Sequence, residues 1–330
     1  MTSLMEVTFD PSLSPATRER ILAVISELDV PELTGDLTVT CLSGGASNVN
    51  VRIDARSQSW ALRVCAPDAE RWGVNRQAAI TAQTDAAAIG LAPKIVASLL
   101  PEGHFLSEFV TARTVTSQLV REENLIPLIA RTLSDLKEGT TDSRDFSPFD
   151  DLRTFVELGD ADGVESPNDL ENLLSAVFRI EALFSARDVP RGFCHSDLVP
   201  QNFLWLDDRL MMVDFDYAGN GWVAFELASL ACQAELNPEE TELFLSSFDP
   251  SLDDGQRARV ELMRVVAGVR DGAWALMAEP YLDQETIPLE GWTYRQYAEN
   301  NFAQARAVVG SGQFAEYMKK ARDVAPTARF

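Results

Sequence analysis

The sequence predicts an α+β chain of two lobes, with a small antiparallel-sheet lobe over residues 1–110 and a larger, mostly helical lobe over residues 111–330. Two observations predict this division. Short segments of alternating or continuous apolar and β-branched residues, separated by turns, fill the first part and are typical of antiparallel strands. After about residue 120 helical apolar spacing dominates, and a hairpin of apolar strands at 202–216 is the main exception.

The first 110 residues combine two expected helices with several strands. The segment "SPATRERILAVISEL" begins with Ser14 as an N-cap and Pro15 at the first helical position, and its apolar residues share one face. The Ala-rich segment 71–90 ends at Gly90, which suits a helix with a glycine stop. The segments expected as strands are 37–43, 48–55, 60–66, 94–100 and 104–110.

The 330-residue chain has a formal net charge of −23, from 51 acidic and 28 basic residues. Such a surface repels nucleic acid and anionic membranes and attracts cations. We therefore expect neither nucleic acid nor a membrane as a partner. The alternative is that the charge reflects only an acidic surface that has no role in binding cations.

The sequence contains no run of 18 apolar residues that would predict a transmembrane helix. The N-terminal "MTSLMEVTFDPS" lacks the basic start and apolar core of a signal peptide.

The cysteines favour a reducing compartment. They lie far apart, have no metal-ligand spacing and sit among apolar neighbours. We expect buried thiols in a cytoplasmic protein. The four residues are Cys41, Cys65, Cys194 and Cys232.

A glycine-rich segment, "LSGGASNVN", joins two expected strands through Gly44 and Gly45. Glycines allow backbone N–H groups to approach a phosphate closely, although a plain hairpin turn explains the pair equally well. The segment is neither a Walker A loop nor a Rossmann fingerprint, because no GK[ST] follows and strands flank it. One strand later, Arg63 lies among apolar residues and needs an anionic partner, for which the phosphates of ATP are a candidate. A surface-facing arginine is the alternative.

The segment "GFCHSDLVPQNFLWLDDRLMMVDFDYAG" carries the strongest chemical signal. Asp197 and Asn202 are five residues apart in the loop before the hairpin, and Asp214 follows it. A hairpin brings such segments together. Phosphoryl transfer needs this set, since one carboxylate orients the attacking hydroxyl and accepts its proton. An amide oxygen and a second carboxylate can hold Mg²⁺, which prefers oxygen ligands.

The segments "FCHSDLVPQNFL", "VDFDYAG" and "FELASL" resemble the choline/ethanolamine kinase family, part of the protein-kinase-like group that includes aminoglycoside phosphotransferases. "LSGGASNVN" is similar to its phosphate-covering loop and "ALRV" to its third strand. The segments "RDGAWALMAEP" and "YRQYAENNFAQA" are similar to paired helices that wall its alcohol site. The resemblance spans about residues 40–305 and implies a protein-kinase-like two-lobe fold that uses ATP and Mg²⁺.

The resemblance also implies roles for single residues. Asp197 would be the catalytic base, with Asn202 and Asp214 as Mg²⁺ ligands. Asp216 would hold a second Mg²⁺ or face the substrate, with Tyr217 beside it. The backbone around 108–110 would bind adenine. The residues expected at the nucleotide are Ser43, Gly44, Gly45, Asn48, Arg63, Glu108 and Val110.

Two residues are expected to brace the catalytic loop. His195 would pack and hydrogen-bond within the loop, and we do not interpret it as a general base. Glu226, in "FELASL", matches a family aspartate and would bind backbone N–H groups of the loop.

A cationic alcohol would be bound by aromatic faces and carboxylates. The resemblance places Trp274 at the position of a cage tryptophan, and Asp271 three residues before it, where some members have an aromatic residue. A carboxylate beside an aromatic ring suits an ammonium group equally well. Ordinary core packing is the alternative for the C-terminal aromatic residues, and we favour it for Trp292 and Tyr297.

The main departure from the family pattern lies in the helix of the small lobe. This helix should offer a glutamate to the strand cation, yet the position is Ala79, and no Glu lies between Glu70 and Glu102. Gln77 could hydrogen-bond Arg63 but cannot neutralise it, so Arg63 is expected to rely on ATP or Glu70. Whether the missing glutamate weakens ATP binding is not decided by the sequence.

These features predict an ATP-dependent kinase that phosphorylates the hydroxyl of choline, ethanolamine or a similar cationic amino alcohol, as a monomer or homodimer. An aminoglycoside or thiamine kinase on the same fold is the second hypothesis, since those substrates are also cationic. A catalytically weak, ligand-binding kinase-like protein is the third, motivated by the missing helix glutamate. The intact Asp197, Asn202 and Asp214 argue against the third.

Overall fold

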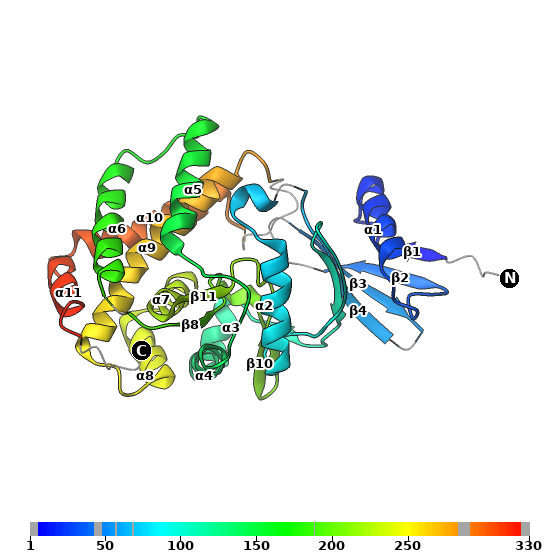
Figure 1. The fold of residues 1–330 in the computed structure, drawn as a ribbon, viewed down its shortest axis with the longest axis horizontal. Coiled ribbons are helices and arrows are strands. Elements are labelled where there is room, and N and C mark those ends of the chain that lie inside the picture. Colours follow the sequence, from blue (N-terminus) through cyan, green and yellow to red (C-terminus); the bar gives the residue numbers. More distant parts are fainter. Residues whose placement is uncertain are drawn as a thin grey trace.

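The computed structural model describes residues 6–42, 48–56, 58–67, 69–187, 189–282 and 291–324. Figure 1 shows two lobes, a six-stranded sheet with its helices on the right and a larger body of packed helices on the left. This arrangement confirms the predicted α+β two-lobe fold.

The sheet of the small lobe has the strand order β1-β2-β3-β4-β6-β5. Its neighbouring strands are antiparallel, except that β1 runs parallel to β2. All of the strands expected in this lobe are present. The sequence pattern does not predict β1, because three residues are too few to show an alternation. The strands are β1 (Val7–Phe9), β2 (Leu37–Cys41), β3 (Val49–Ala55), β4 (Gln58–Val64), β5 (Ile95–Leu99) and β6 (His104–Glu108).

Helix α1 (Pro15–Glu27) packs against this sheet. Its N-cap is Ser14, whose hydroxyl accepts the N–H of Thr17, as predicted. Apolar side chains of α1, such as Ile21 and Val24, form a hydrophobic core with the strands that is separate from the core of the large lobe. The small lobe therefore has its own interior, which supports the strand that carries Arg63.

Helix α2 (Arg76–Ala88) lies between the sheet and the large lobe (Figure 1). The predicted helix over 71–90 begins too early, because a short 3₁₀ turn, η1 (Ala69–Trp72), precedes it. Asn75 caps the true start of α2. At the other end Gly90 has a positive φ of 79°, which suits the predicted glycine stop.

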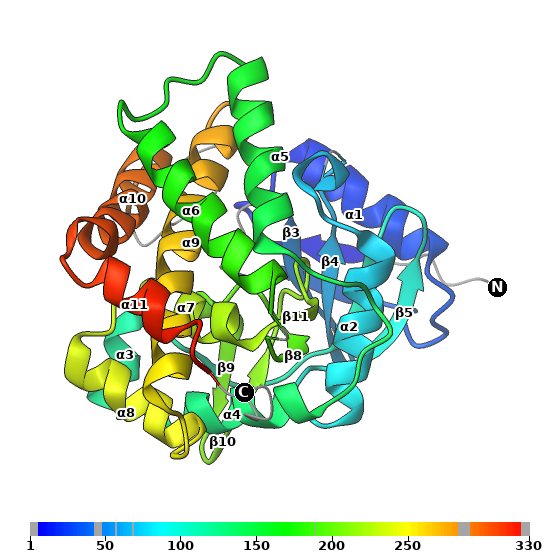
Figure 2. The same cartoon turned by 60° about the vertical axis from the view of Figure 1, so that its left-hand side comes forward.

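Helices make up most of the large lobe. They are α3 (Ser117–Glu122), α4 (Ile126–Glu138), α5 (Pro148–Ala161), α6 (Leu170–Ser185), α7 (Val223–Gln233), α8 (Pro238–Phe248), α9 (Asp254–Ala278), α10 (Tyr294–Gly310) and α11 (Phe314–Lys320). Helix α9 runs through the middle of this lobe and packs against α5, α6, α7, α10 and α11 (Figure 2). Helices α9 and α10 approach closely, since a Cβ added at Gly268 would lie 2.6 Å from the carbonyl oxygen of Asn301.

The hairpin expected at 202–216 is present, and a second strand pair flanks it. The strands are β7 (Arg113–Thr114), β8 (Arg191–Cys194), β9 (Phe203–Leu206), β10 (Arg209–Met212) and β11 (Gly219–Trp222). Strands β10, β9 and β7 form one antiparallel sheet, and β8 pairs with β11. Because β8 leads into the first loop and β11 follows the second, this pairing brings segments 195–202 and 213–218 together.

Two expectations about the environment of the chain can be compared with the structure. No helix in the described ranges has the length and apolar character needed to span a membrane. Cys65, Cys194 and Cys232 are buried free thiols, as expected. The expectation is wrong for Cys41, which is exposed because it lies where β2 ends and leaves the core.

Candidate active site

One buried carboxylate holds the loop that follows β8. Glu226, in the first turn of α7, accepts the backbone N–H groups of His195 at 2.8 Å and Ser196 at 2.9 Å. Ser196 has a φ of 66°, a left-handed conformation that is uncommon outside glycine. Burial raises the pKa of Glu226 to about 7, and the two N–H groups oppose that shift. The predicted bracing role of Glu226 is confirmed by these contacts.

His195 links this loop to the segment after β10. Its Nε2 lies 2.9 Å from the carbonyl oxygen of Val213 and donates to it, and its ring packs against Phe215. Burial lowers the pKa of His195, which favours the neutral ring. The side chain therefore acts as a brace that sets the position of Asp214, the residue after Val213.

We expect Glu226→Gln to lower the free energy of unfolding by about 1–3 kcal/mol and to lower kcat. The reason is that an amide offers one acceptor oxygen, so one of the two loop N–H groups loses its partner. Urea unfolding and steady-state kinetics measure the two effects. Glu239→Gln, an exposed acid in the first turn of α8, is the matched control and should change neither quantity. An unchanged kcat for Glu226→Gln would contradict the bracing role.

Asp197 and Asn202 lie in this loop and are joined by a hydrogen bond. Asn202 Nδ2 donates to the backbone carbonyl oxygen of Asp197 at 2.9 Å. That bond engages the amide nitrogen, so the amide oxygen is the atom suited to a cation. Burial and the neighbouring Asp214 raise the pKa of Asp197 to about 7. A carboxylate with a pKa near the working pH suits a general base.

Asp214 and Asp216 follow β10 and meet the small lobe at Arg63. Nη2 of Arg63 lies 2.8 Å from Asp214 Oδ1 and 2.6 Å from Asp216 Oδ2. Arg63 is 6% exposed, and its guanidinium also lies 5.9 Å from the ring centroid of Phe105. The alternative of a surface-facing arginine is therefore wrong. The contact between Arg63 and the phosphates of ATP stays a prediction.

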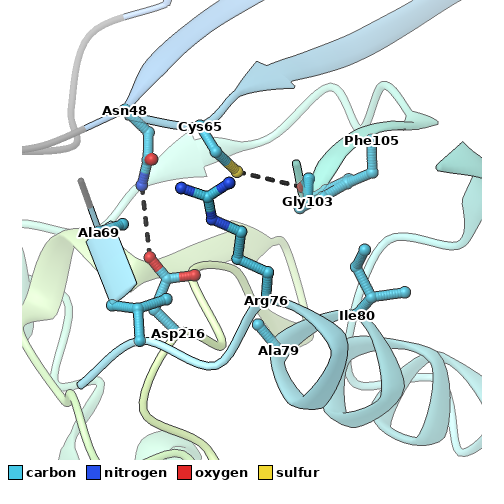
Figure 3. Close-up of a pocket in the computed structure, with 10 residues that line it drawn as sticks. Asn48, Cys65, Ala69, Arg76, Ala79, Ile80, Gly103, Phe105 and Asp216 are labelled. Atoms are coloured by element: carbon cyan, nitrogen blue, oxygen red, sulfur yellow. Dashed lines mark hydrogen bonds between the residues drawn. The ribbon is translucent and has the colours of Figure 1, made fainter. Parts of the chain in front are cut away.

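Helix α2 offers Arg63 no carboxylate partner among the described residues. Ala79 and Asp216 line the same small cavity, of about 10 Å³, between α2 and the sheet (Figure 3). Gln77 is exposed and bonds within its own helix, and Glu70 lies 3.9 Å from the first residue of α2. The expectation that Gln77 or Glu70 contacts Arg63 is wrong.

Three carboxylates, Asp197, Asp214 and Asp216, crowd this site, and two of them, Asp214 and Asp216, share the buried Arg63. Burial raises the pKa of Asp216 to about 6, and repulsion from Asp214 adds to the shift, while Arg63 opposes it. Together with the raised pKa of Asp197, this marks an excess of negative charge that a divalent cation would neutralise.

The donor atoms of the site suit Mg²⁺, because the amide oxygen of Asn202 and the carboxylates are all oxygen ligands. In the described part of the chain, no three His, Cys, Asp or Glu side chains gather into a complete metal cage. Mg²⁺ commonly takes only one or two side-chain ligands and completes its shell with substrate phosphates and water. The residues present therefore fit Mg²⁺ bound together with a nucleotide.

The described residues include only the C-terminal end of the predicted glycine loop. Ser43, Gly44 and Gly45 lie outside the described residues. Asn48, directly after that segment, donates from Nδ2 to Asp216 Oδ2 at 3.3 Å (Figure 3). The end of the predicted phosphate loop thus contacts the same carboxylate as Arg63.

The segment after β6 connects the two lobes. The N–H of Glu108 donates to the carbonyl of Lys94, and the N–H of Phe109 donates to that of Ser59. These bonds fix the orientation of the connection. Adenine binding by the backbone of Glu108 and Val110 stays a prediction.

Asp271 is one of the residues expected to contact the alcohol substrate. Both of its carboxylate oxygens accept hydrogen bonds from protein side chains. Oδ1 accepts from Arg270 at 2.8 Å, and Oδ2 accepts from Gln233 at 2.6 Å. Arg270 also pairs with Asp151 of α5 at 2.8 Å. An ammonium group would therefore meet a carboxylate that already has two protein partners, and substrate contact by Asp271 stays a prediction.

Tyr217 and Trp274 supply aromatic surface. The hydroxyl of Tyr217 donates to the carbonyl of Trp72 at 3.2 Å, and its buried ring packs against Phe155. Trp274 is partly exposed, and the rings of Tyr294 and Tyr297 lie 6.1 and 6.5 Å from it. An aromatic group of this kind can bind a cation, and the roles of Tyr217 and Trp274 at the substrate stay predictions.

Sequence reasoning missed Arg270 and Gln233. Arg270 is 3% exposed and lies over the ring of Tyr217, 4.6 Å from its centroid. The available signal was an arginine followed by an aspartate inside the apolar segment "RVVAGVRDGAWAL". Its partner Asp151 is 119 positions away, so local spacing could not identify the pair.

Comparison with known proteins places this geometry in context. A model of the phosphotransferase enzyme family matches residues 38–267. Protein LicA of Haemophilus influenzae is 25% identical over 210 residues, which are 62% of this chain and 61% of that protein. The chain thus matches about three fifths of the length of that relative. The LicA of strain ATCC 51907 / DSM 11121 / KW20 / Rd is 24% identical, over 61% of this chain and 76% of that protein.

The fold is shared with solved structures of kinases and phosphotransferases. A choline/ethanolamine kinase family protein from Mesorhizobium loti has a TM-score of 0.75 at 18% identity, covering 92% of this chain and 99% of that one. Choline kinase LicA from Streptococcus pneumoniae has a TM-score of 0.71 at 21% identity, covering 89% and 99%. Aminoglycoside phosphotransferase APH(4)-Ia has a TM-score of 0.60 at 14% identity, covering 90% and 98%. These similarities confirm the predicted kinase-like fold.

Proposed function

The chain belongs to the phosphotransferase enzyme family, and we propose from this premise that it transfers the γ-phosphoryl group of ATP to the hydroxyl of choline, ethanolamine or a similar cationic amino alcohol. The observation that carries the proposal is the convergence of Asp197, Asn202 and Asp214 beside a buried Arg63. The names of the LicA relatives and of the choline/ethanolamine kinase structures support the substrate class.

In the proposed reaction each group of this site has one task. Asp197 accepts a hydrogen bond from the acceptor hydroxyl and takes its proton as the new O–P bond forms and the bond from the γ-phosphorus to the departing ADP oxygen breaks. Asn202 and Asp214 would hold Mg²⁺, which would neutralise charge on the phosphates. Arg63 contacts the phosphates from the small lobe. Positioning and charge neutralisation provide most of the rate gain, because the transition state of phosphoryl transfer is loose.

A cytoplasmic location is part of the proposal. The four cysteines are free thiols, which suits a reducing compartment where ATP is available.

An aminoglycoside kinase is the second candidate, because the chain also shares its fold with APH(4)-Ia. The two candidates are separated by measuring ATP consumption with choline, ethanolamine, thiamine and a set of aminoglycosides. We expect turnover with choline or ethanolamine. Turnover with aminoglycosides or thiamine alone would overturn the substrate class but not the reaction. No turnover, together with a thermal shift on adding Mg-ATP, would indicate a ligand-binding protein without catalysis.

We expect Trp274→Ala to raise KM for the cationic alcohol by on the order of 10- to 30-fold, because the face of a desolvated tryptophan contributes about 2 kcal/mol to binding a cation. KM for ATP should change little, since Trp274 belongs to α9 of the large lobe. Trp292→Ala is the matched control, as Trp292 is 39% exposed. An equal change in both variants, or none in Trp274→Ala, would remove Trp274 from the substrate site.

A further inference from the structure

Arg63 is a buried cation that needs a counter-ion. A charge taken out of water is costly unless it is paired and hydrogen-bonded. The side chain of Arg63 is 7% exposed, and within the described ranges its ion pairs are with Asp214 and Asp216. Both partners come from the large lobe, so the cation of the small lobe is neutralised across the boundary between the lobes.

Helix α2 leaves a space where it faces this pair. Ala79 lines a cavity of about 10 Å³ whose opposite side includes Asp216 and Asn48 (Figure 3). Phe105, whose ring lies under the guanidinium of Arg63, lines the same cavity. A longer side chain at position 79 would enter this space, which Asp216 lines together with Arg76 of α2.

Asp216 and Asp214 differ in how they meet Arg63. Oδ2 of Asp216 accepts from Arg63 at 2.6 Å and from Asn48 at 3.3 Å, so one oxygen receives two donors of the small lobe. Its side chain is 13% exposed, against 22% for Asp214. Asp214 directly follows Val213, which His195 ties to the catalytic loop. Asp216 is thus directed at the small lobe, and Asp214 is held beside the loop that carries Asn202.

We propose that Asp216 is the positioning residue of Arg63, taking the place of the carboxylate that α2 lacks at Ala79, and that it is neither a Mg²⁺ ligand nor a substrate contact. Asp214 and Asn202 are then the pair left for the cation. The kinetic part of this inference rests on the proposed function, whereas the stability part does not.

The sign of a stability change shows whether Asp216 acts as the counter-ion of Arg63. Asp216→Asn is compared with the wild type by thermal unfolding in EDTA without nucleotide. A counter-ion of Arg63 stabilises this state, so its loss should lower Tm by about 3–6 °C. If repulsion from Asp214 outweighed the pair that Asp216 forms with Arg63 at 2.6 Å, the loss of the carboxylate would raise Tm instead. A raised or unchanged Tm would overturn the proposal.

The same substitution in an Arg63→Met background completes a double-mutant cycle. With Arg63 removed, Asp216 keeps the hydrogen bond from Asn48, which an asparagine oxygen can also accept, and the repulsion from Asp214, so Asp216→Asn should now raise Tm. A lowered Tm in both backgrounds would mean that Asp216 stabilises the fold without Arg63, which contradicts the proposal.

A carboxylate placed on α2 should rescue the loss. We expect Ala79→Glu to restore most of the Tm of Asp216→Asn, whereas Ala79→Gln, of the same size without charge, should not. If neither or both restore it, Asp216 does not replace a helix carboxylate.

Steady-state kinetics test whether Asp216 also positions Arg63 for ATP, because a purely structural role would leave KM for ATP unchanged. Asp216→Asn should raise KM for ATP about tenfold and leave the apparent Mg²⁺ requirement within about twofold, and Ala79→Glu should reverse the change in KM. A changed Mg²⁺ requirement would instead assign Asp216 to the metal. If no substrate is turned over, the proposed function fails, while the measurements in EDTA still decide whether Asp216 is the counter-ion of Arg63.

Discussion

Replacing Asp197 by Asn is expected to lower kcat by a factor of about 10²–10⁴ while the fold is retained. Asp197 lies in a loop whose backbone is held by Glu226, and Asn202 bonds to the backbone carbonyl of Asp197 rather than to its carboxylate. The substitution therefore removes the proton acceptor and keeps the bond from Asn202 to the backbone. Steady-state kinetics with the best substrate of the panel measure the loss.

The same variant should bind ATP nearly as well as the wild type, because Asp197 acts on the acceptor hydroxyl. It should also unfold at the same or a higher temperature, since it removes one of three crowded carboxylates. Asp208→Asn, in the exposed turn between β9 and β10, is the matched control and should keep full activity. A variant of Asp197 that retains more than about one tenth of kcat would exclude it as the base.

The second large effect is on stability. Arg63→Ala should lower the free energy of unfolding in EDTA by about 3–5 kcal/mol, because removing one partner of a buried ion pair leaves the remaining charges uncompensated. Here two carboxylates, Asp214 and Asp216, lose the same cation. Urea unfolding followed by circular dichroism measures the change. Activity should fall as well, through weaker contact with the phosphates.

A surface pair on the neighbouring strand provides the control. Arg52 pairs with Asp54 at 2.7 Å, but their side chains are 38% and 35% exposed. Pairs of this kind contribute about 0–1 kcal/mol, so Arg52→Ala should have little effect. Equal losses in the two arginine variants would mean that the pairs of Arg63 are no stronger than an exposed salt bridge.

Local patterns predicted much of this molecule. Ser14 caps its helix because its hydroxyl accepts an N–H three residues away, and such a bond is encoded within one turn. The strands of the small lobe follow from alternation over a few residues. The helix expected over 71–90 is the counter-example, because its first residues form a 3₁₀ turn instead.

The candidate site was predictable where its members are close in sequence. Asp197, Asn202 and Asp214 flank a hairpin, and a hairpin brings its two ends together. The partner of Arg63 was not predictable in this way. Gln77 and Glu70 lie nearer to it in sequence, yet they face other groups.

The sequence by itself determined the two-lobe architecture, the hairpin and the identity of the three oxygen-bearing side chains, because each depends on spacings of a few residues. Only the tertiary structure decided which charges neutralise each other. Arg63 meets Asp214 across 151 positions, and Arg270 meets Asp151 across 119. Burial makes an unpaired charge so costly that every buried arginine needs a partner, but the choice of partner depends on which surfaces the packed lobes bring within reach.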